Sequence, residues 1–396
     1  MAYRVLSNIL NKTKGFSYHM RTEVPSSYKP FLSLKEWYNK QPQADKDKLP
    51  TLLAGVGLAL IISQSIGVTG RPVAGYVLIA LSLVVALLLG KKITLGPKYM
   101  WIPLVVIVGV VLLRGILYDV SVGTFEIGFI ALMFSGYLAG RICGRQLFFL
   151  LPIVVITLSF FIYIDAILRP GMTTGGIMDP RNYNLSVAVL IFGTILTTWK
   201  RKWIVMAFAL PAIFLTGASE GILVVAVIAL LVFMRKDWSH RLWLPAGALS
   251  IVFLATFYTG MTDTLYARAH SIITDTTSSS AVTERIDGYK LALTDFSFLG
   301  HGYNPTLTQA PNYDVRSIHN VPLRALYELG PIAALAWCYA MLVGLFKTRY
   351  KYAFGAILAF SLVDHLMWTW LAPIPWLIAG VATVDNEGDY LFRKES

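Results

Sequence analysis

Polar side chains gather in one short stretch of an otherwise apolar chain, the sequence RSIHNVPLRALYELGP at residues 316–331. Within it, His319 lies between Arg316 and Arg324. Imidazole titrates near neutral pH and can accept a proton, whereas guanidinium groups bind phosphate oxygens through two parallel hydrogen bonds. The combination indicates a site that removes a proton beside a phosphate-bearing ligand. The alternative is a surface or capping histidine.

The same stretch carries the signals of a helix start, which would position these side chains. Asn320 is a good helix cap, and Pro322 is tolerated in a first turn because an N–H there has no helical partner. A helix that begins at this point places His319 at its mouth. The free backbone N–H groups and the positive dipole end of such a helix suit an anion. We therefore expect His319 and Asn320 to line the ligand site.

The composition of the whole chain indicates a membrane protein made of helices. Of its 396 residues, 56% are hydrophobic and only 14% are charged, which is typical of a polytopic membrane protein. A span needs about 20 mostly apolar residues to cross roughly 30 Å of hydrocarbon. The sequence thus predicts an all-α fold with about twelve spans, near residues 50–69, 72–90, 99–117, 121–140, 147–168, 183–199, 203–218, 220–234, 242–260, 320–346, 352–368 and 370–385.

The distribution of basic residues predicts the orientation of the chain. Lys and Arg accumulate in short cytoplasmic loops, and with residues 1–49 inside, most of the 34 basic residues fall on that side. No cleavable signal peptide is expected, because segment 1–49 is polar, basic and aromatic. Both termini are therefore expected in the cytoplasm. The formal charge of +12 mostly reflects this bias, and the chain lacks the basic-aromatic platform of a nucleic-acid binder.

The basic residues expected on the outer side are almost all arginine, which again favours an anionic ligand. They are Arg71, Arg114, Arg169, Arg181, Arg268, Arg285, Lys290, Arg316 and Arg324. Each arginine is either a phosphate ligand or an anchor held by a salt bridge or by snorkelling. Arg71 and Arg114 best fit the second description.

One long outer loop would deliver several of these residues to the membrane surface. The expected layout is an inner segment 1–49, spans one to nine at 50–260, a large outer loop 261–319, spans ten to twelve at 320–385 and an inner tail 386–396. Within the loop, ERIDGYKLALTDF predicts an amphipathic helix with Arg285 near its start and Tyr289 one turn on, followed by the glycine turn FLGHGYNP. A loop of this length is often functional.

Polar residues also occur inside the expected spans. Asp364 and His365 are adjacent in SLVDHLMW, and a charge near the bilayer centre costs at least about 2.5–3.5 kcal/mol, so both are expected to face the protein interior. Neighbours on a helix point in different directions, so at most one is expected to line a given cavity. Glu328 is placed to pair with Arg324, one turn earlier.

Nothing in the sequence predicts a metal site, a disulfide or a cofactor. The two cysteines, Cys143 and Cys338, are far apart in the expected topology. No cluster with the spacing of metal ligands appears in the outer segments.

Four sequence elements resemble the O-antigen polymerase and O-antigen ligase superfamily. SIHNVPLRALYELG resembles its His-Asn-x-x-Leu…Glu-x-Gly signature, and ERIDGYKLALTDFSFLGHGYN resembles the preceding Arg, aromatic and Gly-x-Gly element. DPRNYNLSVAVLIFG and LTGASEGILVVAVIALLVF are similar to an Asn-containing span start and a Thr-Gly-x-Ser-Arg-Gly span start. Together they cover residues 180–345, approximately. Glu220 stands where the family has an Arg, and Arg181 or Arg169 on the neighbouring loop can substitute for it.

The resemblance implies a type C glycosyltransferase that works without metal or cofactor at the periplasmic face of a bacterial inner membrane. Its donor, and main binding partner besides membrane lipids, would be a glycan on undecaprenyl pyrophosphate. His319 would be the general base and Arg285 the catalytic stabiliser of the leaving diphosphate. The resemblance places further contacts to pyrophosphate or glycan at Arg169, Arg181, Tyr289, Arg316, Asn320 and Arg324.

Within the superfamily, a polymerase fits better than a ligase, because the His-Asn segment is compact and the Ser-Arg pair is missing. A polymerase extends another lipid-linked repeat unit, and a chain-length regulator would then be a partner. A ligase transfers the glycan to lipid A-core instead. A lipid or solute transporter is the remaining alternative, although no repeat between the two halves of the chain supports it.

Overall fold

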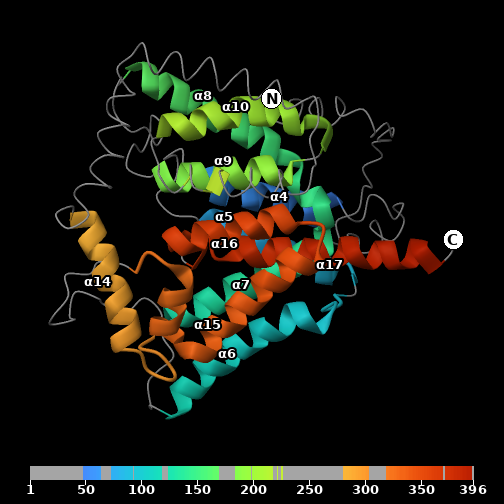
Figure 1. The fold of residues 1–396 in the computed structure, drawn as a ribbon. Helices are drawn as coiled ribbons and strands as arrows, with labels where there is room; N and C mark the ends of the chain where they lie inside the picture. Colours follow the sequence, from blue (N-terminus) through green and yellow to red (C-terminus); the bar gives the residue numbers. More distant parts are fainter. Residues whose placement is uncertain are drawn as a thin grey trace. The chain divides into compact units, whose positions relative to one another are not determined.

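The described part of the chain is helical (Figure 1). The computed structural model describes residues 48–63, 73–91, 93–117, 124–168, 183–197, 199–216, 221, 224–225, 280–302, 318–368 and 371–394. All of them belong to the unit Ala44–Ser396. No strand occurs among them, so the all-α class predicted from the sequence is confirmed for this part.

The helices follow the order of the expected spans. They are α4 (Lys48–Ser63), α5 (Val73–Leu88), α6 (Lys98–Leu117), α7 (Thr124–Cys143), η2 (Gly144–Leu150), α8 (Leu151–Leu168), α9 (Tyr183–Leu196), α10 (Trp199–Thr216), α14 (Ser280–Thr294), α15 (Val321–Lys347), α16 (Lys351–Val363), η5 (Leu366–Trp368) and α17 (Pro373–Lys394). All but two of the expected spans coincide with one of these helices. The ranges 220–234 and 242–260 lie outside the described residues, apart from a few positions. Helix α17 continues to Lys394, past the expected span end, because a helix need not stop where its apolar residues stop.

Length and composition indicate that the chain associates with a membrane. Among the described residues, the stretches long and apolar enough to cross one are Lys98–Leu117, Glu126–Leu168 and Val321–Lys347. The second of these comprises α7, η2 and α8, with Gly144 in a left-handed conformation (φ 54°) after the end of α7. Helices α4, α5, α9, α10, α16 and α17 carry shorter apolar segments. The count of about twelve spans and the side on which each loop lies stay predictions.

Large apolar side chains are divided between a packed interior and the surface. Trp337, Trp368 and Trp376 are fully buried, whereas Leu335 and Phe346 are 70% and 79% exposed. Exposed apolar side chains of this size suit contact with lipid hydrocarbon, and in water they would form a patch that favours association.

Glycines allow α7 and α17 to cross with their backbones in contact. Gly136 and Gly140 lie four residues apart on α7, the spacing of a small-xxx-small helix interface. A Cβ added at Gly140 would lie 2.1 Å from the Leu377 carbonyl oxygen, and one added at Gly380 would lie 2.1 Å from the Tyr137 carbonyl oxygen. Van der Waals packing of this kind stabilises helix association in lipid. The hydrophobic effect does not drive association there, because lipid tails are as apolar as the helix surface.

Helix α15 consists of two helical segments joined at Gly330. This residue has φ 82° and ψ 175°, a backbone conformation that glycine adopts at little cost. Pro331 follows, and its ring removes a backbone N–H that a continuous helix would use. The last carbonyl groups of the first segment are therefore open to donors from elsewhere in the chain.

The glycine turn after α14 supplies those donors. The His301 N–H donates to the Tyr327 carbonyl oxygen at 3.0 Å, and the Gly302 N–H donates to the Glu328 carbonyl oxygen at 2.8 Å. Gly300 and Gly302 have φ values of 72° and 102°, and a Cβ at Gly300 would lie 2.1 Å from the Glu328 carbonyl oxygen. The expected glycine turn is thus confirmed, and it ties α14 to the first segment of α15.

The crossing of α7 and α17 can be tested with one methyl group. Gly140→Ala places a Cβ 2.1 Å from the Leu377 carbonyl oxygen, well inside the van der Waals contact distance. We therefore expect a lower thermal midpoint in detergent and a loss of about 1–3 kcal/mol in the free energy of unfolding. Gly128→Ala, on the same helix, is the matched control, because nothing lies within 4 Å of its added Cβ. Alanine is the better helix former, so that variant should be unchanged or more stable. Equal midpoints for the two variants would contradict the close crossing.

Candidate functional site

The start of α15 positions His319. Asn320 has an extended backbone (φ −157°), and its side-chain Oδ1 accepts a hydrogen bond from the Leu323 N–H at 2.9 Å, with Pro322 in the first turn. Its Nδ2 donates to the Leu362 carbonyl oxygen at 3.0 Å. The predicted helix cap is confirmed, and it additionally joins the start of α15 to the last turn of α16. Asn320 therefore fixes the backbone next to His319, whose side chain is half-buried.

Helix α14 brings Tyr289 to the backbone of His319. The Tyr289 hydroxyl donates to the His319 carbonyl oxygen at 3.5 Å, a long hydrogen bond. Arg285, one turn earlier, is half-buried and close enough to Tyr289 to act on it electrostatically. Burial raises the pKa of the Tyr289 phenol by more than the Arg285 guanidinium lowers it, so the phenol keeps its proton and remains a donor. The amphipathic helix expected at 284–296 is confirmed, with bounds Ser280–Thr294.

Apolar contacts hold α14 in this place. Leu291 and Ala292 are buried against Ile318 and Tyr327, with Leu323 packed beside them. Leu291 and Ala292 lie on the same helix as Arg285 and Tyr289. Burial of these two apolar residues against Ile318 and Tyr327 therefore also fixes where Arg285 and Tyr289 lie along α15. Helix α14 thus brings Tyr289 to the backbone of His319, with Arg285 one turn away from Tyr289. That Arg285 and His319 act in one site stays a prediction.

The expectation for Asp364 and His365 was wrong in its geometry. Helix α16 ends at Val363 and not at 368, and Asp364 has an extended backbone (φ −145°, ψ 161°). The Asp364 Oδ1 accepts a hydrogen bond from the Leu366 N–H at 2.9 Å, so the side chain competes with the helix for a backbone donor. Off a helix, adjacent side chains can point to the same place, and Asp364 and His365 both reach the side chain of His319.

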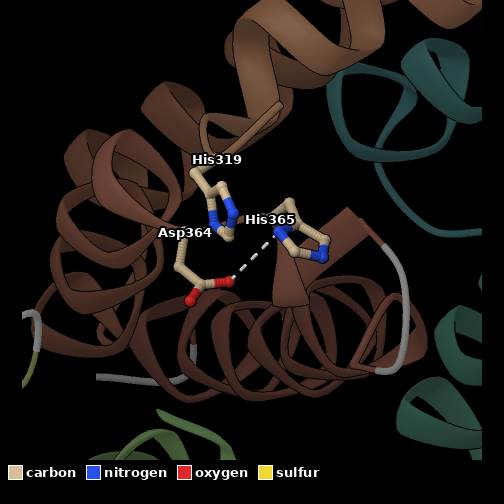
Figure 2. A group of neighbouring side chains, drawn as sticks. All are labelled: His319, Asp364 and His365. Atoms are coloured by element: carbon tan, nitrogen blue, oxygen red, sulfur yellow. Dashed lines mark ion pairs between the residues drawn. The ribbon is translucent and has the colours of Figure 1, made fainter. Parts of the chain in front are cut away.

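His319, Asp364 and His365 form one cluster, with Asp364 turned toward the two imidazoles (Figure 2). The rings of His319 and His365 lie edge to face, with centroids 4.9 Å apart and planes at 75°. The Asp364 Oδ1 lies 3.6 Å from the His365 Nδ1. One nitrogen or oxygen ligand atom from each residue lies within 4.8 Å of the others. In the sequence, the signal for Asp364 and His365 was their position in the apolar segment SLVDHLMW. Polar side chains are costly to bury in such a segment unless they have polar partners inside the protein.

A buried charged network lies beside this cluster. The Arg324 Nε donates to the Glu328 Oε1 at 2.6 Å, and the Trp368 Nε1 donates to the Glu328 Oε2 at 2.7 Å. Arg324 and Glu328 are 5% and 1% exposed, and the Arg324 charge is close enough to act on His365. The predicted pairing of Glu328 with Arg324 is confirmed. It commits the Arg324 Nε to a carboxylate inside the protein.

Arg114 serves as an anchor for the glycine turn. Its Nη1 forms an ion pair with Glu126, and its Nη2 donates to the His301 carbonyl oxygen at 3.2 Å. The ion pair agrees with the prediction that Arg114 is an anchor held by a salt bridge and not a phosphate ligand. Arg169, Arg181 and Arg316, together with Glu220, lie outside the described residues, so their phosphate contacts stay predictions.

No family model matches the chain, and no curated protein matches it either. The chemistry of the site therefore follows from its residues. It combines two imidazoles, a buried carboxylate and a phenol that donates to the backbone of His319, with a half-buried guanidinium on the same helix as the phenol. Such a set can move a proton next to an anionic group.

The buried network is open to a stability test. Glu328→Ala removes the carboxylate from a guanidinium that is 5% exposed, so we expect a loss of about 3–5 kcal/mol, seen as a lower thermal midpoint in detergent. Glu328→Gln keeps an acceptor for Trp368 and should lose less. The double variant Arg324→Met with Glu328→Met removes both charges and should recover most of the stability. A double variant no more stable than Glu328→Ala would contradict a charge-based role.

Proposed function

We propose that this protein is a membrane glycosyltransferase that takes a glycan from a polyprenyl diphosphate and transfers it to an acceptor hydroxyl on the outer side of the membrane. One observation supports this most: α14, which carries Arg285, packs against the helix start that carries His319, and Tyr289 reaches the His319 carbonyl oxygen. The proposed base thus directly precedes the cap of one helix, and the proposed anion-binding guanidinium lies on another helix that packs against it. The sequence resemblance names the same pair.

The proposed reaction has a simple balance. The acceptor oxygen attacks the anomeric carbon, the bond from that carbon to the diphosphate oxygen breaks, and the diphosphate departs with the bonding electrons. The acceptor proton moves to His319, which acts as general base and contributes about 10²–10⁴-fold to the rate in comparable cases. Attack from the face opposite the leaving group inverts the anomeric centre.

Arginine would carry the charge that develops on the leaving diphosphate. Preorganised positive groups at such a position are often the largest single contribution to catalysis. Arg285 fits this role because it lies on an element outside the apolar spans and beside the His319 segment. Arg181, Arg316 and Arg169 are further proposed ligands. We propose a different role for Arg324, which the sequence had suggested as a phosphate contact. Because it is paired with Glu328, it is a fixed charge beside the cluster of His319, Asp364 and His365.

The acceptor separates two forms of this proposal. We favour a polymerase, which adds the glycan to another lipid-linked repeat unit, over a ligase, which adds it to lipid A-core; both use the same donor chemistry. In a bacterium that depends on this protein, deletion of a polymerase leaves lipopolysaccharide with a single repeat unit. Deletion of a ligase leaves none. Electrophoresis of lipopolysaccharide from the deletion strain distinguishes the two outcomes, and an unchanged polysaccharide would contradict both.

His319 is the residue on which the mechanism can be tested directly. In His319→Ala, we expect release of undecaprenyl diphosphate from the glycosylated lipid to slow by about 10²–10⁴-fold, with donor binding retained because the guanidinium groups are intact. His301→Ala is the matched control, since His301 is exposed and is not one of the three side chains clustered at His319. It should keep its turnover. A His319→Ala variant with full turnover would remove His319 from the mechanism.

A further inference from the structure

The cluster of His319, Asp364 and His365 has a donor set that the proposed reaction does not fully use. Two imidazoles and one carboxylate come from chain segments that are 45 residues apart, and one ligand atom of each lies within 4.8 Å of the others. Among the described residues, this is the group of three or more such side chains close enough to hold a metal ion. Two nitrogen donors with one carboxylate oxygen are typical ligands of zinc and other divalent transition metals.

The charges around the cluster favour the binding of a cation there. Asp364 is 2% exposed, and a buried carboxylate is stable when it is paired or bound to a metal ion. The nearby Arg324 charge is balanced by Glu328, whose oxygen lies 2.6 Å from the Arg324 Nε. The cluster itself then presents one carboxylate, from Asp364, and two imidazoles. Neutral imidazole is the form that binds metal.

The geometry needs only a small adjustment. Ligand atoms in a tetrahedral zinc site lie roughly 3.4 Å apart, given bond lengths of about 2.1 Å. Since the ligand atoms here lie within 4.8 Å of one another, the widest separation must shrink by up to about 1.4 Å. Side-chain rotation can supply this while the backbone stays in place. Asn320 fixes the segment next to His319, and the Leu366 N–H holds the Asp364 carboxylate. An oxygen that accepts one hydrogen bond keeps a lone pair for a metal.

We infer that His319, Asp364 and His365 bind one Zn²⁺ ion, and that the bound ion inhibits the protein. Three protein ligands leave a fourth position for water or substrate in a tetrahedral site. The inhibition rests on the proposed function: when zinc occupies the lone pair of the His319 imidazole, His319 can no longer take the proton from the acceptor hydroxyl. Zinc binding itself does not depend on the reaction. Mg²⁺ does not compete well, because it prefers oxygen ligands in octahedral geometry.

The binding is tested with Zn²⁺ alone. The full chain, purified in detergent without a histidine tag and freed of metal, is titrated by isothermal calorimetry. We expect one saturable site that Mg²⁺ does not displace. His365→Ala should weaken it by at least about ten-fold, since loss of even an outer-sphere partner costs about 10–100-fold. His301→Ala is the matched control, because His301 has a carboxylate neighbour, Asp295 at 3.9 Å, but no third ligand in the described structure.

A second measurement guards against a variant that fails to fold. Co²⁺ added to the unaltered chain should give the visible d–d absorption of a tetrahedral nitrogen and oxygen site, and Zn²⁺ should abolish it. Binding that is weaker than about 1 mM, or equal in His365→Ala and the unaltered chain, would overturn the site. An absorption spectrum of free, octahedral Co²⁺ would do so as well.

The inhibitory part has its own outcome. Zn²⁺ should lower diphosphate release with the midpoint found by calorimetry, and a chelator should restore it. Stoichiometric binding with undiminished turnover would overturn the inhibition and leave the site. A chain that binds zinc but never releases lipid diphosphate, with or without a chelator, contradicts the proposed function and supports the site alone.

Discussion

One amide side chain fixes the two segments on which the candidate site depends. Asn320 caps α15 through its Oδ1 and binds the Leu362 carbonyl oxygen through its Nδ2. Both bonds satisfy backbone groups at helix ends, which in an apolar surrounding cost several kcal/mol when left unmade. His319 precedes this residue directly, and Asp364 lies two residues after Leu362. A single side chain therefore holds together the two ends from which the cluster is built.

The same requirement, that each backbone group finds a partner, connects α14 to the bundle. The break at Gly330 interrupts the hydrogen bonds of α15, and the turn at 300–302 supplies N–H groups to the carbonyls next to that break. An interrupted helix is tolerated at membrane depth only where other groups complete it. Because the turn follows α14, the completion of α15 also helps to place Tyr289 beside the backbone of His319, with Arg285 one turn earlier on α14. The position of α14, which carries Arg285, thus depends in part on the hydrogen bonds that the carbonyl groups next to Gly330 require.

The sequence alone predicted the elements that local chemistry determines. The cap at Asn320, the glycine turn, the amphipathic helix and the Arg324–Glu328 pair each depend on residues within a few positions of one another. The break at Asp364 could not be predicted in this way, because apolar residues continue to Trp368 and helical periodicity then separates Asp364 from His365. The outcome is decided by a carboxylate that captures the Leu366 N–H, and by Asn320 on another helix. Likewise, the crossing of α7 and α17 joins Gly140 and Gly380, which are far apart in the sequence, and it is known only from the fold.

The charges around His319 separate two directions of approach. Arg285 on α14 provides positive charge on the side of Tyr289, whereas Asp364 provides negative charge on the side of His365, where Arg324 is already balanced by Glu328. Two like unit charges about 4 Å apart repel by about 4 kcal/mol at an effective dielectric constant of 20. On the proposed function, a diphosphate beside Asp364 would meet this repulsion, so the donor belongs on the α14 side. The acceptor hydroxyl would then approach from the Asp364 side, which is also where the proposed zinc ion would bind. A zinc ion and an acceptor would therefore compete for His319 without displacing the donor.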